Sequence, residues 1–235
     1  MSLRWSGIDV SVYQTRIDWE RLSANFAILR AGYGKVASQK DKLFETHYAN
    51  AKKEKVNVSA YGYSYAMSEA EARQEAKACI ECLKGKQFEY PIYYDVEEKK
   101  QYALGKKTVS AIVRAFCEEL EAAGYWVGLY TNASWYNSVI EDDIKSRYAI
   151  WIAHWDVSKP GISGQYGVWQ YGVGAVDGVV GDCDKDYSYL DYPTMIKAAG
   201  KNGFAPTPTP TPGKKTIDVT MTVDNVTYSG TLTEK

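Results

Sequence analysis

The residues YPIYYDVE, at positions 90–97, join a β-prone apolar run to two acids at its carboxyl end. Side chains of an extended strand alternate between its faces, so Asp95 and Glu97 are expected to point the same way. Neighbouring carboxylates resist ionising together, and a carboxyl with a raised pKa can donate the proton that glycosidic bond cleavage needs. A strand without catalytic function that runs into the charged turn Glu98-Lys99-Lys100 would show the same pattern. The rest of the chain is therefore needed to distinguish the two interpretations.

Strand-like and helical patterns alternate on both sides of that stretch. The strand-like runs are residues 7–10, 27–33, 58–65, 91–97, 126–131, 149–153 and 167–171. Helical patterns cover residues 42–55, 69–83 and 108–123, with Ser68 as an N-cap and Gly124 as a stop. This spacing predicts an α/β fold, an incomplete (β/α) barrel of the TIM-barrel type. Because the chain is short for such a barrel, outer helices are expected to be short or missing, mainly after Thr131.

Acids and aromatic residues stand at the expected carboxyl ends of these strands, where barrel active sites form. They are Asp9, Tyr33, Tyr63, Tyr65, Asp95, Glu97, Tyr130, Trp155 and Gln170, followed by Asp182, Asp184 and Asp186 on a last strand-like segment. The whole chain has 20 Tyr and 7 Trp against 5 Phe. Rings with a flat apolar face and a polar tip suit sugar stacking. The sequence therefore predicts a sugar-binding cleft with an acidic floor.

The overall composition limits the classes of ligand and partner that the protein is expected to bind. With 28 basic and 29 acidic residues the net charge is −1, which gives no indication of nucleic-acid binding. No apolar run is long enough to span a membrane, and Met1–Ser6 lacks the apolar core of a signal peptide. Cys79 and Cys82 form a lone Cys-x-x-Cys pair, and His47 and His154 are the only histidines. We therefore expect no metal site, no cofactor and ordinary thiols.

The composition changes abruptly at APTPTPTPG, residues 205–213, which predicts a stiff Pro/Thr linker between a barrel of residues 1–204 and a module of residues 214–235. Alternating apolar residues and a turn at Asp224-Asn225 predict a β-hairpin there. The expected cross-strand pairs are Val223 with Val226, Met221 with Tyr228, Ile217 with Leu232, and Thr222 with Thr227. An isolated hairpin is barely stable. This one is therefore expected to pack on something, as a wall-binding or self-association module that could make the chain a homo-oligomer.

Six short motifs occur in a characteristic order: GIDVSVYQ at 7–14, RAGYG at 30–34, YDVE at 94–97, GLYTN at 128–132, WQY at 169–171 and GVVGDCD at 178–184. Together they resemble glycoside hydrolase family 25, the muramidases of phage endolysins and bacterial autolysins, over about residues 5–192. The resemblance implies cleavage of the β-1,4 bond between N-acetylmuramic acid and N-acetylglucosamine in bacterial peptidoglycan, with retention and without a cofactor. It suggests an endolysin made in the host cytoplasm without a signal peptide that acts on the bacterial cell wall.

The resemblance also implies roles for four acids. Glu97 matches the general acid, Asp95 the acid that assists the intermediate, and Asp9 the acid of the first strand. The family pattern after Gly181 selects Asp184 over Asp182 as the last acid, while Lys185 and Asp186 depart from the pattern and leave the local hydrogen bonding open.

Asp95 stands only two residues from Glu97 on one strand. That spacing favours orientation of the substrate N-acetyl group over attack from the opposite face, although a covalent intermediate stays open. Tyr33, Tyr63, Tyr65, Tyr130, Trp155 and Gln170 are the candidate substrate-binding residues. A non-catalytic wall-binding barrel and a chitinase-like hydrolase are the competing interpretations.

Overall fold

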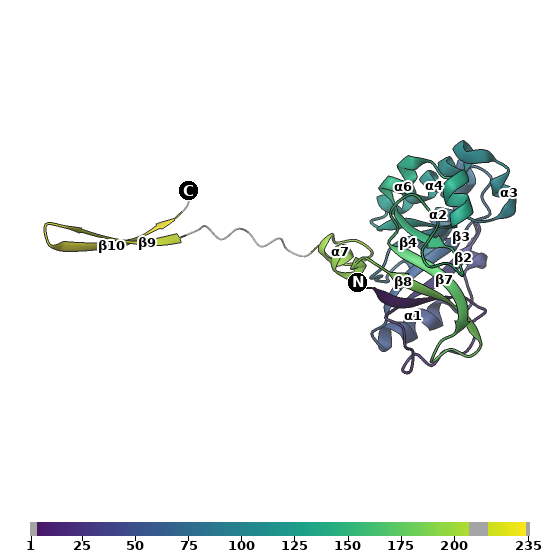
Figure 1. Ribbon diagram of the computed structural model, residues 1–235, viewed down its shortest axis with the longest axis horizontal. Coiled ribbons are helices and arrows are strands. Elements are labelled where there is room, and N and C mark those ends of the chain that lie inside the picture. The colour runs from purple at the N-terminus through teal and green to yellow at the C-terminus, as the bar shows by residue number, and fades with distance from the viewer. Residues whose placement is uncertain (1–3, 207–215, 234–235) are drawn as a thin grey trace.

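Eight strands close into one barrel in the order of the chain, and a two-stranded sheet follows (Figure 1). The structure is a computed structural model that describes residues 4–206 and 216–233. The barrel strands are β1 Trp5–Val10, β2 Phe26–Tyr33, β3 Asn57–Tyr63, β4 Ile92–Asp95, β5 Val127–Asn132, β6 Ala149–Ala153, β7 Val168–Ala175 and β8 Asp182–Ser188. Every strand predicted between residues 7 and 171 is present, which confirms the barrel.

The last strand differs from the expectation of a parallel sheet throughout. Strands β1 to β7 pair in parallel with their sequence neighbours, whereas β8 runs antiparallel to both β7 and β1 and closes the sheet. The cause is the short connection: residues 176–181 join β7 to β8, and a parallel crossover needs a dozen residues or more. Because β8 is reversed, its first residues lie at the carboxyl ends of the other strands.

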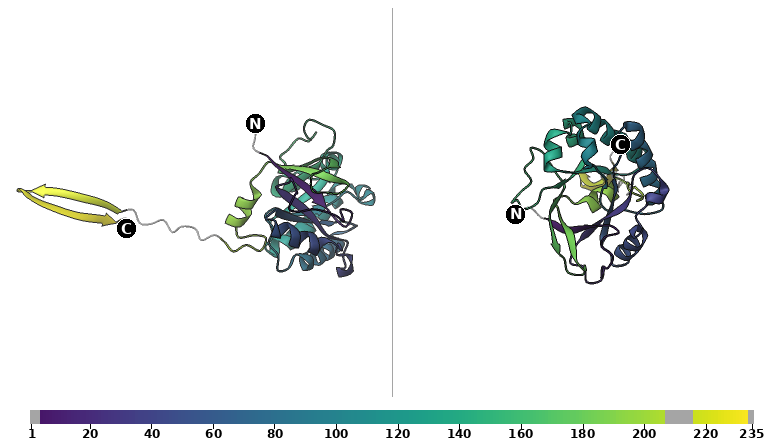
Figure 2. Two further views of the ribbon diagram at one scale, coloured as in Figure 1. Left: turned by 90° about the horizontal axis from the view of Figure 1, so that it is seen from below. Right: turned by 90° about the vertical axis from the view of Figure 1, so that its right-hand side faces the viewer.

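The helical layer is incomplete, as the chain length predicts. Helices α1 Phe44–Lys53, α2 Glu69–Leu83 and α4 Gly105–Ala122 cover β2 to β5, while β7 and β8 form a side without helices (Figure 2). The remaining α-helices, α3 Lys99–Tyr102, α5 Ala133–Ser138, α6 Asp142–Arg147 and α7 Tyr192–Ala198, are short. None of the helices in the described residues is both long and apolar enough to cross a bilayer. The short α5 and α6 confirm the loss expected after Thr131.

Helix boundaries follow the capping residues where these exist. The Ser68 side chain accepts a hydrogen bond from the Glu71 backbone N–H, and α2 spans the residues predicted for it. The N-cap of α4 is Leu104, which makes no side-chain cap, and this helix begins three residues before the predicted Thr108. Because no side chain caps this helix, the sequence contains no residue that indicates where the helix begins.

A loop connects β1 to β2. Ile17 bridges to Val179, and the Asp18 N–H donates to the Gly178 carbonyl at 2.7 Å, so the β7–β8 turn packs on this loop. Gly178 has φ +91°, and a Cβ there would lie 2.8 Å from the Asp18 oxygen. Glycine is therefore required at this contact.

The interior of the barrel is closed at its amino end by the segment after β8. Tyr192 and Ile196 of α7 join the buried side chains of Phe26, Tyr90 and Trp151. Asn202 is fully buried and ties this segment down: its amide donates to the Phe88 and Tyr90 carbonyls and accepts from the Trp126 N–H. The four cysteines are free and buried, as expected for ordinary thiols.

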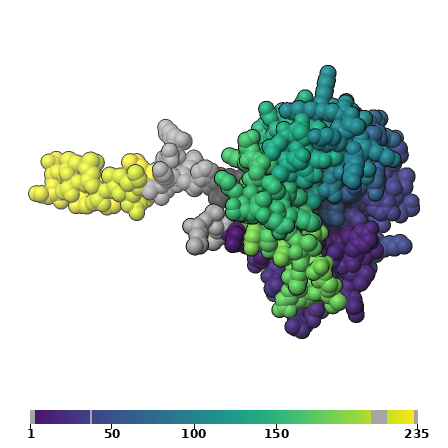
Figure 3. Space-filling model, turned by 45° about the vertical axis from the view of Figure 1, so that its right-hand side comes forward, coloured from purple at the N-terminus to yellow at the C-terminus, as the bar shows by residue number. Residues whose placement is uncertain are grey.

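Strands β9 Thr216–Val223 and β10 Val226–Thr233 form the predicted hairpin, and all four predicted pairs are present. Asp224 and Asn225 have φ of 49° and 66°, the left-handed pair that a two-residue hairpin turn requires. The apolar face is uncovered, with Met221, Tyr228 and Leu232 more than half exposed. Figure 3 draws the hairpin clear of the barrel surface. The packing partner predicted for it is therefore not found in the described residues, and most of the predicted linker, residues 207–213, lies outside them.

Candidate active site

Four acids meet in one hollow at the carboxyl ends of the strands. Asp9, Asp95, Glu97 and Asp184 line a cavity of about 350 Å³, together with Arg30. They come from β1, from the end of β4 and just beyond it, and from the first half of β8. Asp184 pairs directly with Asp9 across the β1–β8 ladder. Asp182 is exposed at the start of β8 and does not line the hollow, so the geometry favours the register that selects Asp184.

Asp95 and Glu97 both line this hollow, although only Asp95 belongs to the strand. β4 ends at Asp95, and Val96 between them is buried in the core and donates its N–H to the Tyr130 carbonyl. Burial is the first cause of a raised pKa for both carboxyls; like charges, Glu97 for Asp95 and Asp184 for Glu97, add to it, and Arg30 opposes it for Asp95. The mutual repulsion expected from the sequence is therefore found in one direction only and comes second to burial: Glu97 raises the pKa of Asp95, whereas the like charge acting first on Glu97 is that of Asp184.

The two carboxyls differ in access. Asp95 is buried, and its Oδ1 has no hydrogen-bond partner within the described residues. Glu97 is half-buried, and its carboxyl makes no hydrogen bond to the described protein. Glu97 also lines a second hollow of about 550 Å³ beside β5 and β6, with Asn132, His154 and Trp155. Glu97 therefore stands where two hollows meet.

Gln170 on β7 holds the floor of the site together. Its amide N–H donates to Asp9 Oδ2 at 2.8 Å, and its Oε1 accepts from the Tyr130 hydroxyl and from Trp155 Nε1, both at 3.0 Å. Gln170 is almost fully buried, and the Tyr130 ring packs on Trp151 with 4.3 Å between centroids. The contacts that the structure shows for Gln170 and Tyr130 thus orient neighbouring side chains.

Asp186 is a fifth acid beneath the site, to which the sequence argument gave no role. It is fully buried, accepts a hydrogen bond from Trp151 Nε1 at 2.8 Å, and burial raises its pKa to about 8. Burial is also the first cause of a raised pKa at Asp9, and the charges of Asp186 and Asp184 follow. The departure from the family pattern at this position thus adds a buried carboxyl below the hollow that Asp9, Asp95, Glu97 and Asp184 line.

Tyrosines form one rim of the site. Tyr33 ends β2, Tyr63 ends β3, and Tyr65 follows in the loop; Tyr65 lies 6.3 Å from Tyr33 and 5.0 Å from Tyr63 between ring centroids. Tyr33 and Tyr65 are exposed, as is Trp155 in the loop after β6. Of the rings predicted to stack on sugar, Tyr33, Tyr63, Tyr65 and Trp155 therefore flank the acids on two sides, whereas Tyr130 is buried.

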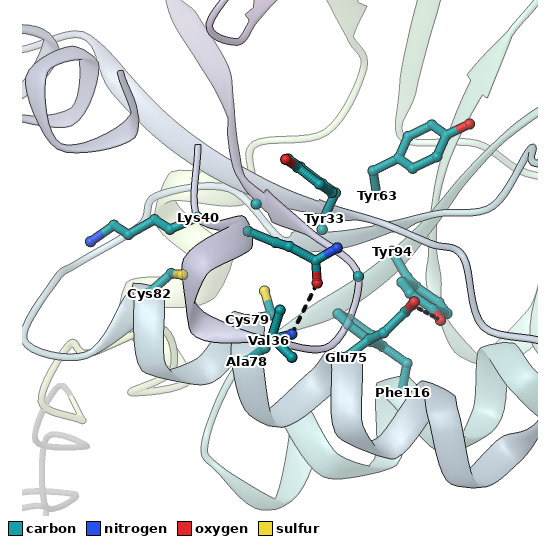
Figure 4. Close-up of a pocket in the computed structure, with 14 residues that line it drawn as sticks. Tyr33, Val36, Lys40, Tyr63, Glu75, Ala78, Cys79, Cys82, Tyr94 and Phe116 are labelled. Atoms are coloured by element: carbon teal, nitrogen blue, oxygen red, sulfur yellow. Dashed lines mark hydrogen bonds between the residues drawn. The ribbon is translucent and has the colours of Figure 1, made fainter. Parts of the chain in front are cut away.

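A buried carboxylate behind the barrel braces the Tyr65 loop. Glu75 of α2 accepts a hydrogen bond from the Tyr94 hydroxyl at 2.7 Å (Figure 4) and another from the Tyr65 N–H at 2.9 Å. Ser64 donates to Tyr94 and accepts from Gln101. The adjacent cavity, bounded by Tyr94, Cys79 and Phe116, holds only about 10 Å³. That is room for about one water molecule and not for a sugar.

Several of these residues were not predicted from the sequence. Glu75, Asp186, Tyr13 and the Arg30–Asp41 ion pair each act across 10 or more residues of chain. In the sequence, a single acid on a helix such as Glu75 cannot be distinguished from an acid that is exposed to solvent. Only the fold shows which residues it contacts. Asp186 carried a signal, since it departs from the family pattern. Within the described residues, no cluster of His, Cys, Asp and Glu is placed to hold a metal ion.

An acid at the junction of two hollows, ringed by tyrosine and tryptophan at the mouth of a β/α barrel, defines a glycosidase-like site. The family model for glycosyl hydrolases family 25 matches residues 8–179, and the chain belongs to this family. The match ends before Asp184, so the place of that acid rests on the geometry.

Curated and solved relatives agree with the family. The chain is 26% identical to Lysozyme M1 of Streptomyces globisporus over 199 residues, covering 77% of this chain and 66% of that protein. The bacterial lysozyme from Streptomyces coelicolor superposes with a TM-score of 0.69 at 27% identity, covering 77% and 90% of the two chains. The autolysin LytC from Streptococcus pneumoniae, solved with a synthetic peptidoglycan ligand, gives 0.70 at 24% identity over 78% and 46%. The chain thus spans just under two thirds of Lysozyme M1.

Proposed function

We propose that this protein is an N-acetylmuramidase, which hydrolyses the β-1,4 bond between N-acetylmuramic acid and N-acetylglucosamine in bacterial peptidoglycan. The observation that carries the proposal is the position of Glu97, an acid with a raised pKa at the junction of two hollows. A glycan strand running through both hollows would cross Glu97 at a glycosidic oxygen. The family membership and the relatives named as lysozymes support this activity and a site of action at the bacterial cell wall.

Glu97 is the proposed general acid. Its half-buried carboxyl holds its proton more tightly than a free glutamic acid, because burial and the charge of Asp184 raise its pKa. It therefore keeps its proton to a higher pH than a free glutamic acid, as a donor to the leaving oxygen requires. As pH rises through this raised pKa, the fraction of protonated Glu97 falls, and kcat is expected to fall with it.

Asp95 is proposed to orient the N-acetyl group of the muramic sugar, whose carbonyl oxygen attacks the anomeric carbon. Two inversions at that carbon, first by the N-acetyl oxygen and then by water, give net retention. Asp95 lines the same hollow as Glu97 and leaves Oδ1 without a partner within the described residues. A carboxyl with unused hydrogen-bonding capacity suits an amide N–H.

The other acids and the aromatic residues have supporting roles in this proposal. Asp9, held by Gln170, and Asp184 close the acidic floor from β1 and β8. The exposed rings of Tyr33, Tyr65 and Trp155, with Tyr63 beside them, stack on sugar faces along the groove. Gln170 and Tyr130 act as positioning residues that hold Asp9 and Trp155.

Replacement of the proton donor tests the catalytic proposal. Glu97→Gln is expected to lower the rate of reducing-end release from purified peptidoglycan by at least about 10³-fold, because the amide cannot act as an acid. Glu98→Gln, the neighbouring acid that lines neither hollow, is the matched control and should retain activity. Circular dichroism checks the fold of both variants. Full activity of Glu97→Gln would refute the assignment.

The same assay separates the competing interpretations. A non-catalytic wall-binding barrel would bind saccharide without releasing any reducing ends. A chitinase-like hydrolase would release reducing ends from chitin oligosaccharides faster than from peptidoglycan.

The domain organisation is a second proposal: a catalytic barrel of residues 1–204, a linker of residues 205–213, and the hairpin module of residues 214–235. Seven apolar side chains of the hairpin are exposed, and burying them would supply the stability that two strands alone lack. We propose that this face serves wall attachment or self-association. Removal of residues 206–235 should then weaken wall binding or reduce the number of chains per particle, as determined from the mass measured by light scattering. No change in either would contradict the proposal.

A further inference from the structure

Another cavity, a groove on the side of β2, adjoins the hollow that Asp9, Asp95, Glu97 and Asp184 line, which we call the catalytic hollow. The charged side chains that line the groove are mainly basic, whereas those of the catalytic hollow are mainly acidic. The groove measures about 650 Å³ and shares Tyr13, Arg30 and Tyr63 with the catalytic hollow. Its other lining residues include Lys40 and Lys42, and its only acid is Asp41. The catalytic hollow, by contrast, has four acids and Arg30 as its only cation. The charge therefore changes sign from one hollow to the next, with Arg30 at the boundary.

Arg30 is fixed in place with part of its guanidinium unused. Its Nε donates a hydrogen bond to Asp41 Oδ2 at 2.8 Å, and its Nη2 forms an ion pair with the same oxygen at 2.8 Å. The central carbon of its guanidinium lies 5.3 Å from the Tyr13 ring centroid and 5.9 Å from that of Tyr33. Asp41 is buried and is itself held by the Val12 and Leu43 N–H groups, from which it accepts hydrogen bonds. Nη1 of Arg30 makes no hydrogen bond to the described residues. A guanidinium held in this way is preorganised for an anion.

Two lysines extend the positive lining outward. Lys40 is already paired with Glu45 of α1. Lys42 is exposed and forms no ion pair with any residue that the structure describes. The glycan backbone is uncharged, so tyrosine faces would be enough to bind it. Cations in the same groove indicate an anionic part of the ligand.

We propose that this groove binds, through Arg30 and Lys42, the carboxylates of the peptide stem that branches from the muramic sugar being cleaved. This inference rests on the proposed muramidase function and adds a substrate preference to it. The stem is the anionic group attached nearest to the reacting bond, and the groove opens directly from the hollow that would hold that sugar. Stems that carry free carboxylates then bind more tightly than neutral ones.

Chemical amidation of the stem provides the test, because it removes charge with little change in size. Soluble peptidoglycan strands are prepared with free stem carboxylates or with the same groups converted to carboxamides, and KM and kcat are measured for both. The wild-type protein should show a KM about threefold lower for the carboxylate form, the scale of an ion pair at a partly exposed site. The preference should weaken at high salt.

Charge reversal at the exposed lysine assigns the preference to the groove. Lys42→Glu should abolish or invert the KM ratio of the two polymers, whereas Lys107→Glu, an equal change of net charge on α4 outside the hollows, should leave the ratio as in the wild type. Equal KM values in the wild type, or equal effects of both substitutions, would overturn the proposal while leaving the muramidase assignment intact. Failure of the wild type to cleave either polymer would overturn both.

Discussion

The carboxyl end of β4 and the interior of β8 each hold an acid whose pKa is raised by burial, yet their surroundings differ. Glu97 lines two hollows and makes no hydrogen bond to the described protein, whereas Asp186 is sealed in the barrel and receives a hydrogen bond from Trp151. A raised pKa therefore does not by itself mark a catalytic acid. Access to substrate separates a proton donor from a buried structural acid.

After Glu97→Gln, the largest loss of activity is expected at Asp95, which lines the same hollow as Glu97. Asp95→Asn keeps the shape but removes the acid that we propose orients the N-acetyl group. We expect kcat to fall by about 10²-fold or more, with a smaller change in KM. Steady-state kinetics on soluble peptidoglycan strands measure this. Retention of most of the activity would contradict the substrate-assisted route.

A smaller effect is expected at Asp186, and it concerns the free energy of unfolding instead of kcat. Replacement of this acid should make the protein more stable. The folded pKa of Asp186, about 8, lies above the ordinary value of 3.8, so the folded state binds more protons than the unfolded state between these values. Stability of the wild type therefore falls as pH rises through that window. Asp186→Asn removes this cost and should gain about 1 kcal/mol or more at pH 8, and less at pH 5.

Chemical denaturation at the two pH values measures this gain, and Asp182→Asn, an exposed acid on the same strand, is the matched control. Activity of Asp186→Asn should stay within a few-fold of the wild type. An unchanged stability at both pH values, or a loss of activity as large as that of Asp95→Asn, would remove the distinction between the two regions.

Much of the fold is readable from the sequence because its signals are local. Period-two alternation and a two-residue turn were enough to place every predicted pair of the hairpin, from Val223–Val226 to Ile217–Leu232. Ser68 marked the start of α2. The antiparallel direction of β8 was not predicted, because the alternation of residues in a strand does not show which way the strand runs. The short connection of residues 176–181 was the signal that could have indicated it.

The site was predictable where acids and aromatic residues follow strands and not where contacts are remote. Asp9, Asp95, Glu97 and Asp184 do line one hollow. The pairing of Arg30 with Asp41, and of Glu75 with the Tyr65 loop, depends on how a strand meets a loop or a helix on the other side of it. Burial, which dominates the pKa shifts of Asp95 and Glu97, likewise exists only in the folded chain.

The central claim is that this barrel cleaves the bond on the reducing side of N-acetylmuramic acid. Mass spectrometry of fragments from digested and chemically reduced peptidoglycan tests it most directly. The wild type should produce fragments that end in reduced N-acetylmuramic acid, and Glu97→Gln should not. Fragments that end in reduced N-acetylglucosamine would contradict it.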